Sequence, residues 1–490
     1  MAQYRSILKA TSIFGGTQVL SMFVTIIRSK FVAILIGSTG MGLSSMYMSS
    51  LTMVITIFGL GIGTSVVREL SSCRENGDIE RFTLIVSVYK RILLFSAIAG
   101  TIFVILLSHF FSEWAFKTNE HTIDYCFLSL IVLFTLLSSG NNALLVSMRK
   151  IKDTASCGII GSIVSLLTSI PLFYFWGIDG IVPGLIISTF ANYVITFFYA
   201  RKLKIRTKYV SLHEIYKYGR PMVTLGVAMI VASLVGQLVT YLINISISRL
   251  GGLSDIGFFN AAMGITLQVI GMVYAAMAAD YYPRLAGVMN DREKMSETIN
   301  EQSEILLLLT MPILSIFIII APIVIRILLS SEFLVITSFI RIVCLGMLLK
   351  TAAYALGYAS FAKGDKKIYL FLEGGYSNGV NLILSVSFYY LWGLIGLAWS
   401  FVVNYLLYYI VISYVDVKRY QYSMSKELKH LTFLSFVVLG VMLVLDMTTE
   451  GIIYYFSSSI IACAVLVYYL YLLNKKTGLY QVVKTKILKK

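Results

Sequence analysis

The chain has 490 residues, of which 58% are hydrophobic and only 13% are charged. Soluble proteins carry about 25% charged residues, so this composition excludes an ordinary water-soluble protein and predicts a surface that largely faces lipid. The formal net charge of +16 does not indicate nucleic-acid binding, because the basic residues lie in short segments between apolar runs rather than on one coherent face.

Apolar runs follow one another along the whole chain. A helix needs about 20 apolar residues to cross about 30 Å of hydrocarbon, and fourteen runs approach or exceed that length. They span residues 10–36, 41–67, 91–110, 122–148, 154–175, 180–200, 222–249, 256–283, 303–329, 334–361, 368–390, 394–415, 431–447 and 452–473. The predicted fold class is therefore all-α, a polytopic membrane protein with about 14 transmembrane helices.

The basic residues between the runs predict an orientation. Of the 40 Lys and Arg residues, 33 lie in alternate connecting segments, and Lys117 is the one basic residue in the opposite set. Cytoplasmic loops carry the excess of Lys and Arg in membrane proteins. Both termini are therefore expected in the cytoplasm.

The sequence shows no pattern typical of catalysis or of metal or nucleotide binding. Its five cysteines and four histidines are scattered without metal-ligand spacing. No GxxxxGK[ST] loop is present to hold the phosphates of ATP, and no loop is long enough for a soluble catalytic domain. We expect a transporter with no catalytic residue, metal or cofactor, and coupling to a proton or a sodium gradient stays open.

A shift of about 215 residues aligns the chain weakly with itself. Gly42 then matches Gly257, and residues 173–180 (FYFWGIDG) match 388–396 (FYYLWGLIG) with a one-residue slip. Six spans per repeat is an even number, so the halves are parallel repeats, which in transporters hold substrate between them. We predict a six-helix lobe over residues 1–205, a second over 206–420, and two extra helices with a basic tail over 421–490.

Basic residues also occur inside the runs, where each costs several kcal/mol unless it meets water or a partner. We expect Arg28, Arg341 and Lys350 to line a water-filled cavity, with an ion pair that only joins helices as the alternative. Arg249 lies near an outer helix end, from which its side chain can reach water, and Lys30 fits either interpretation. A cavity lined by these five cations would attract an anion.

Two further arginines occupy near-equivalent places in the repeat. Arg68 and Arg284 lie at inner helix ends, where positive-inside topology accounts for both. The alternative is that they bind an anionic head group at the inner cavity mouth. Glu373 lies near an inner end and is expected at the membrane interface.

Neutral polar and aromatic residues are frequent within the runs. Amides suit sugar hydroxyls but also join helices, and joining helices is the simpler role for any one of them. The amides are Asn141, Asn142, Gln237, Asn244, Asn260, Gln268, Asn378, Asn381 and Asn404. We expect most of the 32 Tyr and 29 Phe residues to pack at the lipid or interface.

The chain resembles the O-antigen (Wzx-like) flippase branch of the multidrug/oligosaccharidyl-lipid/polysaccharide (MOP) exporter superfamily. The resemblance covers essentially the whole length. It rests on the opening span from Ser6 to Gly37 with an arginine in its second half, on Gly40-Met41-Gly42-Leu43, on the stretch GLGIGTSVVREL at 59–70, and on the layout of twelve plus two spans.

This resemblance implies a V-shaped bundle of two lobes around a cationic cavity, in the bacterial cytoplasmic (inner) membrane. The implied substrate is an undecaprenyl-pyrophosphate-linked oligosaccharide, with membrane lipids, a polysaccharide polymerase and other assembly proteins as partners. Family members place arginines of the first and seventh spans in the cavity, which correspond to Arg28 and Arg249. A cation-coupled drug exporter, a membrane polymerase or ligase, and a lipid II flippase remain alternatives.

Overall fold

The computed structural model describes residues 20–21, 23–449 and 451–477, which are almost entirely helical and include no β-strand. The all-α prediction is therefore confirmed for this part of the chain. Backbone contacts divide the chain into two compact units. The first comprises Met1–Gly257 with Ile327–Ser330, and the second comprises Phe258–Arg326 with Ser331–Lys490.

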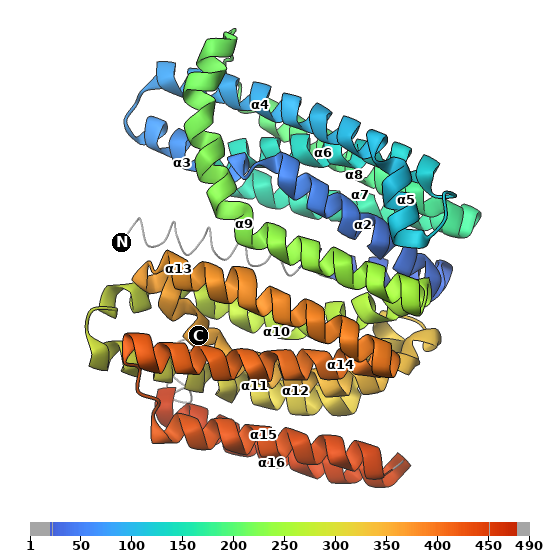
Figure 1. Ribbon diagram of the computed structural model, residues 1–490, viewed down its shortest axis with the longest axis vertical. Coiled ribbons are helices and arrows are strands. Elements are labelled where there is room, and N and C mark those ends of the chain that lie inside the picture. The colour runs from blue at the N-terminus through green and yellow to red at the C-terminus, as the bar shows by residue number, and fades with distance from the viewer. Residues whose placement is uncertain (1–19, 22, 450, 478–490) are drawn as a thin grey trace, which may run out of the picture. The chain divides into compact units, whose positions relative to one another are not determined.

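The first unit is a bundle of long helices that run alongside one another (Figure 1). Residues 23–35 form a helix that is broken from the next one at Ile36 and Gly37. The elements that follow are α2 (Gly37–Gly59), α3 (Ile62–Glu75), α4 (Ile79–Leu106), α5 (Ser108–Phe116), α6 (Thr122–Ser147), α7 (Ile151–Trp176), η1 (Gly177–Gly180), α8 (Ile181–Arg201) and α9 (Leu212–Leu250).

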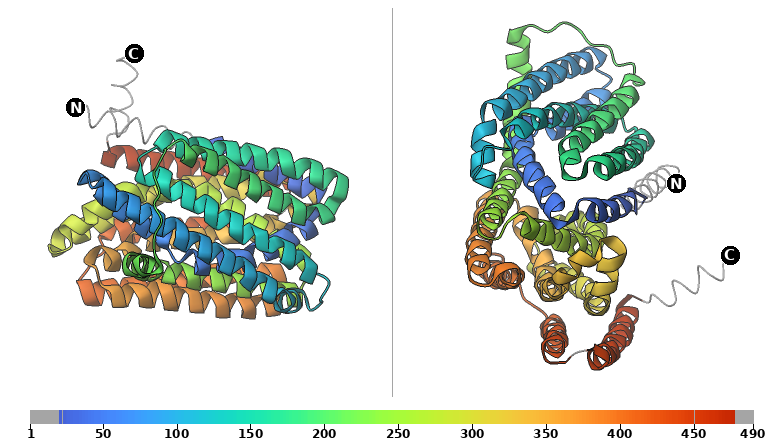
Figure 2. Two further views of the ribbon diagram at one scale, coloured as in Figure 1. Left: turned by 90° about the horizontal axis from the view of Figure 1, so that it is seen from above. Right: turned by 90° about the vertical axis from the view of Figure 1, so that its right-hand side faces the viewer.

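The second unit contains most of α10 and the helices after it. Its elements are α10 (Leu253–Val288), α11 (Arg292–Leu328), η2 (Ser331–Ile336), α12 (Thr337–Lys363), α13 (Lys366–Tyr369), the π-helical η3 (Leu370–Tyr376), α14 (Ser377–Tyr420), α15 (Lys426–Thr448) and α16 (Gly451–Thr477). Helix α12 packs against α14 and α15, and α15 packs against α16 (Figure 2).

Ten helices among the described residues are long and apolar enough to cross a membrane, or up to 11 if one bent pair counts as a span. Two of these segments, Ile151–Arg201 with 51 residues and Lys366–Tyr420 with 55, are far longer than one crossing at 1.5 Å per residue. Each folds back at an internal break. The count of fourteen crossings remains a prediction.

The two breaks share one backbone conformation. Gly177 has φ 56° and ψ −127°, and Gly393 has φ 60° and ψ −141°. Only glycine adopts these angles readily, because a Cβ would clash with the backbone. A second glycine follows three residues later in each hairpin. A Cβ on Gly180 would lie 2.4 Å from Leu172 O, and a Cβ on Gly396 would lie 1.9 Å from Phe388 O.

Glycines also set close helix contacts within the first unit. A Cβ on Gly61 would lie 2.2 Å from Gly226 O, so α3 and α9 meet backbone to backbone. Helix α9 also packs against α2, α4 and α5. The lobe boundary predicted at residue 206 stays a prediction, and the structure shows α9 as part of the first compact unit.

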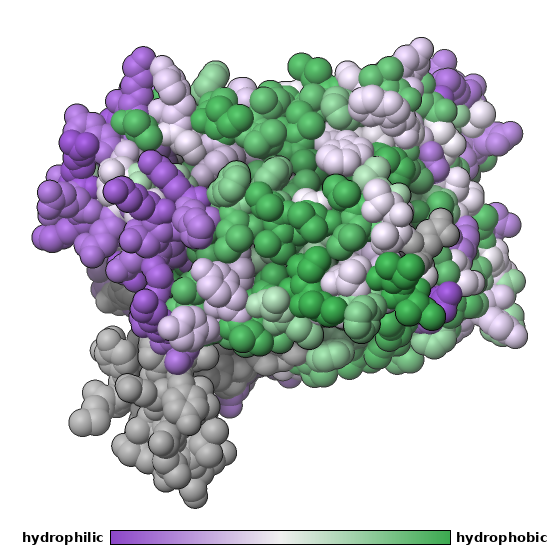
Figure 3. Space-filling view, turned by 90° about the horizontal axis from the view of Figure 1, so that it is seen from below, coloured by the Kyte–Doolittle hydropathy of each residue, from purple (hydrophilic) through white to green (hydrophobic). Residues whose placement is uncertain are grey.

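The outer surface is apolar over a broad area. On the face shown in Figure 3, hydrophobic side chains cover the middle and hydrophilic ones gather toward the ends. Among the exposed apolar residues are Phe175, Ile383, Phe433 and Ile452, the last with 86% of its surface accessible. Together with the apolar helices, this identifies an integral membrane protein.

Candidate functional site

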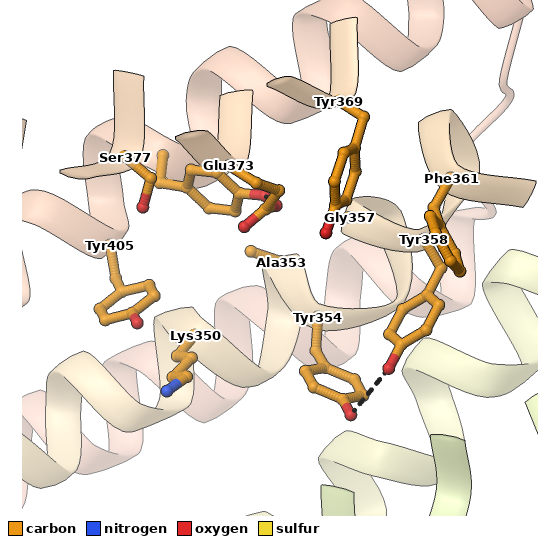
Figure 4. A pocket seen from close by; sticks show the side chains of 11 residues that line it. Lys350, Ala353, Tyr354, Gly357, Tyr358, Phe361, Tyr369, Glu373, Ser377 and Tyr405 are labelled. Atoms are coloured by element: carbon orange, nitrogen blue, oxygen red, sulfur yellow. Dashed lines mark hydrogen bonds between the residues drawn. The ribbon is translucent and has the colours of Figure 1, made fainter. Parts of the chain in front are cut away.

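Lys350 lines a cavity of about 450 Å³ in the second unit (Figure 4). That volume falls within the usual range of about 300–1,000 Å³ for ligand pockets. One wall is a single face of α12, because residues four, seven, eight and eleven positions after Lys350 are neighbours on a helix. The lining consists of Lys350, Ala353, Tyr354, Gly357, Tyr358, Phe361, Tyr369, Glu373, Ser377, Tyr405 and Tyr408.

The Lys350 ammonium forms no close ion pair with an acid among the described residues, although the Glu373 carboxylate lines the same cavity. Its Nζ lies 5.3 Å from the ring centroid of Tyr405 and 6.0 Å from that of Tyr274. Aromatic faces stabilise a cation without neutralising it. The Lys350 ammonium therefore keeps its three hydrogen-bond donors available to a ligand.

Glu373 lies on another wall of the cavity, and no ion pair between described residues joins it to Lys350. The Tyr408 hydroxyl donates a hydrogen bond to Glu373 Oε1. The residue sits on the π-helical segment η3, whose carbonyls at Glu373 and Gly374 accept hydrogen bonds from Asn378 Nδ2. Single π-turns occur often at functional sites. The expectation that Glu373 is interfacial stays a prediction, and the structure places the residue in the lining of this cavity.

Tyrosines hold the cavity wall in place. Tyr354 stacks on Tyr274 with ring centroids 4.4 Å apart and shares a hydrogen bond of 3.3 Å with the hydroxyl of Tyr358. The Tyr274 hydroxyl is in turn 2.8 Å from Thr351 Oγ1. A Cβ on Gly357 would lie 3.3 Å from the Tyr408 hydroxyl and 3.5 Å from Glu373 Oε1, so a small residue here leaves room for that pair.

Arg341 does not reach this cavity, although it lies on the same helix. It is 7% exposed and forms an ion pair with Asp446 of α15. Its Nε donates to Ile318 O at 3.1 Å, and its guanidinium lies 4.6 Å from the ring centroid of Tyr454 on α16. The cavity interpretation of Arg341 is corrected, because its charge is neutralised where it joins α12 to the last two helices.

Two predicted cations of the first unit hydrogen-bond to backbone carbonyls at helix ends. Arg249 donates from Nε and Nη2 to Trp114 O, at 3.0 and 2.8 Å, which agrees with an exposed helix-end arginine. Lys30 donates to Leu329 O. These bonds satisfy donors that a substrate would otherwise use.

Arg28 differs, since its Nε is buried and has no hydrogen-bond partner among the described residues. A buried donor without a partner costs about 1–3 kcal/mol, so a ligand or water that supplied an acceptor would be favoured. Arg28 stays a predicted substrate-binding residue. Within the part of the chain that the structure describes, no other predicted cation of the first unit has a buried donor without a partner.

The two arginines predicted at the inner cavity mouth have different surroundings. Arg68 is exposed on α3. Arg284 donates from Nη2 to Oε1 of the buried Gln302, at 3.0 Å. Their role as head-group contacts stays a prediction.

Sequence reasoning missed the aromatic character of the site. One signal for an aromatic cavity wall was present in the sequence, namely the spacing of Tyr354, Tyr358 and Phe361 along one helix face. Tyr405 and Tyr408 gave no signal, because their place beside α12 depends on how α14 packs.

The fold is that of transporters of the MOP superfamily. A solved structure titled lipid II flippase MurJ in an inward closed conformation is similar over 94% of this chain and 99% of its own, with a TM-score of 0.70 and 16% identity. An inward-facing multidrug resistance MATE family transporter of that superfamily is similar over 82% of this chain and 96% of its own, with a TM-score of 0.61 and 14% identity. A third similar structure is a MOP superfamily transporter from Pyrococcus furiosus, described as having a binding pocket of reverse polarity. It is similar over 84% of this chain and 96% of its own, with a TM-score of 0.57 and 16% identity.

The sequence narrows this class further. A family model described as polysaccharide biosynthesis protein matches residues 31–338, which is more than half of the chain. The chain therefore belongs to this polysaccharide biosynthesis protein family. No curated protein sequence matches it significantly.

Proposed function

We propose that this protein is a flippase for a lipid-linked oligosaccharide. The substrate would be an undecaprenyl-pyrophosphate-linked repeat unit of O-antigen or a related surface polysaccharide. Alternating access would move it from the cytoplasmic to the periplasmic leaflet of a bacterial inner membrane. The observation that carries the proposal is family membership over residues 31–338, and the likeness to a lipid II flippase supports a lipid-linked cargo.

The chemistry of the Lys350 cavity is consistent with such a cargo. Hydrocarbon rejects the charge of a pyrophosphate and the hydroxyls of a sugar, which lose their hydrogen bonds to water. Lys350 offers a cation, Glu373 and Ser377 offer hydrogen-bonding groups, and six aromatic rings offer flat faces for the apolar side of a sugar ring. Binding of this kind lowers the barrier to crossing without any covalent step. Coupling to a proton or sodium gradient, and assembly with a polymerase, belong to the same proposal.

The proposal is tested by complementation and by direct translocation. The intact protein is expressed in a strain that lacks its own O-unit flippase, and surface polysaccharide is measured. In proteoliposomes, a fluorescent undecaprenyl-pyrophosphate oligosaccharide is followed by quenching from outside. Restored polysaccharide and protein-dependent translocation are expected. Failure of both assays with well-folded protein overturns the proposal.

A second candidate is a cation-coupled multidrug exporter, favoured by one feature. An acid inside an aromatic cavity, as Glu373 is, can also hold a lipophilic cation. Expression in an exporter-deficient strain separates the two functions, because a drug exporter lowers susceptibility to cationic compounds without restoring polysaccharide.

A further inference from the structure

A second cavity, of about 410 Å³, lies in the first unit, where residues near the ends of α6 and α8 meet the middle of α4. Its polar lining comes from Lys90 on α4, Asn141 on α6, Arg201 at the end of α8, and Lys204 just beyond it. The remaining lining residues are Leu144, Phe197, Ala200 and Ile205. None of the three cations belongs to the set predicted to bind substrate.

The fold brings these side chains together from distant parts of the sequence. Lys90 lies in the middle of the sequence of α4, and Asn141 lies six residues before the last residue of α6. Helix α6 packs against both α4 and α8. After α8 the backbone turns, with Lys204 N donating to Arg201 O at 3.1 Å and Lys204 at φ 49°. This turn returns Lys204 to the same cavity as Arg201.

Every charged group of this lining is a donor. Lys and Arg carry donors and no acceptor, and no Asp or Glu lines the cavity. The side chains of Lys90, Arg201 and Lys204 form no ion pair or hydrogen bond with any described residue. Positive-inside topology explains why cations occur at this end, but it does not require three of them to share one cavity.

Asn141 supplies an independent observation. Its Nδ2 is buried and has no hydrogen-bond partner among the described residues. A buried donor is normally satisfied. An acceptor-rich ligand in this cavity would satisfy Asn141 and the three cations at once.

We propose that this cavity binds a phosphate group, as a monophosphate or diphosphate ester. A phosphate presents only acceptor oxygens to such a site at neutral pH, and charge-assisted bonds to Lys and Arg are the strong ones. The phosphate belongs either to an anionic lipid head group or to a soluble diphosphate. The site goes beyond the proposed flipping activity and does not depend on it.

The test compares two triple variants that remove equal charge from the full-length protein. K90Q/R201Q/K204Q removes the cations of the cavity. K202Q/R206Q/K208Q removes three cations from the same connection that do not line the cavity, and the residues of both sets are exposed. Elution as a single species and an unchanged melting temperature establish that both fold. Asn141→Leu provides a further variant that removes the buried donor and leaves the net charge as it is.

Two probes distinguish the sources of phosphate. Binding of radiolabelled inorganic pyrophosphate is measured in detergent, and retention of phosphatidylglycerol over phosphatidylcholine is measured by native mass spectrometry from nanodiscs holding equal amounts of each. We expect at least a tenfold loss in one assay for K90Q/R201Q/K204Q, a smaller loss for Asn141→Leu, and less than a threefold change for K202Q/R206Q/K208Q.

Loss confined to pyrophosphate identifies a diphosphate ligand, and loss confined to phosphatidylglycerol identifies a lipid head group. Equal losses for both triple variants would show a general charge effect and overturn the proposal. No loss for either triple variant overturns it as well.

Discussion

Gly42 and Gly257, which the internal repeat aligns with each other, meet backbone to backbone in the structure. A Cβ on Gly42 would lie 1.7 Å from Leu253 O, and one on Gly257 would lie 2.0 Å from Ser38 O. Small residues let membrane helices approach this closely, and packing is the main source of their association. The contact joins α2 to the start of α10.

Gly42→Ala and Gly257→Ala are therefore expected to destabilise the protein. Overpacking costs about 1–3 kcal/mol or more when the neighbour is backbone that cannot move away. The measurement is the melting temperature of the purified protein in detergent, where each variant should melt several degrees lower. Gly264→Ala is the control on α10, because nothing lies within 4 Å of its added Cβ and alanine favours a helix. Equal melting of Gly42→Ala and Gly264→Ala would contradict the close contact.

The Arg341–Asp446 pair should act on stability and not on transport. Both side chains are largely buried, with 9% and 16% of their surface exposed. Removal of one partner from a buried pair strands the other charge and costs about 3–5 kcal/mol, whereas an apolar replacement of both is often neutral. Arg341→Met and Asp446→Leu should each lower the melting temperature, and the double variant should recover most of it. A folded double variant without transport would assign Arg341 to the substrate path after all.

Lys350→Gln should abolish most transport while the fold persists. Loss of one hydrogen bond to a charged group costs about 1.5–3 kcal/mol, which corresponds to about tenfold or more in rate or affinity. The readout is initial translocation of the labelled lipid-linked oligosaccharide in proteoliposomes. Lys350→Arg keeps the charge and should keep much of the activity. The matched control is Lys367→Gln, an exposed lysine of α13 outside the cavity; activity equal to that of this control would remove Lys350 from the site.

Asp365 should make stability depend on acid pH. The Arg419 Nε donates to its Oδ2 at 2.6 Å, and this bond holds the pKa of Asp365 below its usual value. The pKa of Asp365 is therefore lower in the folded than in the unfolded protein, where a carboxyl pKa is about 3.9. The ion pair stabilises the fold fully above that unfolded value, and the stabilisation is lost as pH falls through the lower, folded pKa.

The difference in melting temperature between wild type and Asp365→Asn should therefore be steady above about pH 5 and shrink below about pH 4. Arg419→Gln removes the main cause of the shift and should reduce this pH dependence. A difference that stays constant down to pH 3 would argue against the ion pair.

The helical class and the position of the last hairpin in each repeat could be predicted, because hydrophobic length and glycine placement are local properties of the sequence. The surroundings of individual charged side chains could not be predicted from the sequence. Arg341 and Lys350 lie nine residues apart on one helix and look alike in sequence. One meets Asp446 and the other meets tyrosine rings, because different neighbours pack on different sides of α12. The place of Glu373 in the cavity could not be predicted for a related reason, since the π-turn that carries it cannot be read from hydrophobic periodicity.

The matching angles of Gly177 and Gly393 bear on the history of the chain. Gly177 and Gly393 have nearly the same backbone angles, and the glycine three residues after each lies against a carbonyl eight residues before it. Such agreement is expected from gene duplication, because residues other than glycine adopt these angles only at an energetic cost. The two hairpins should consequently be interchangeable modules: a chimera that carries residues 389–396 in place of 173–180 would insert and fold, even where its flanking aromatic residues no longer match.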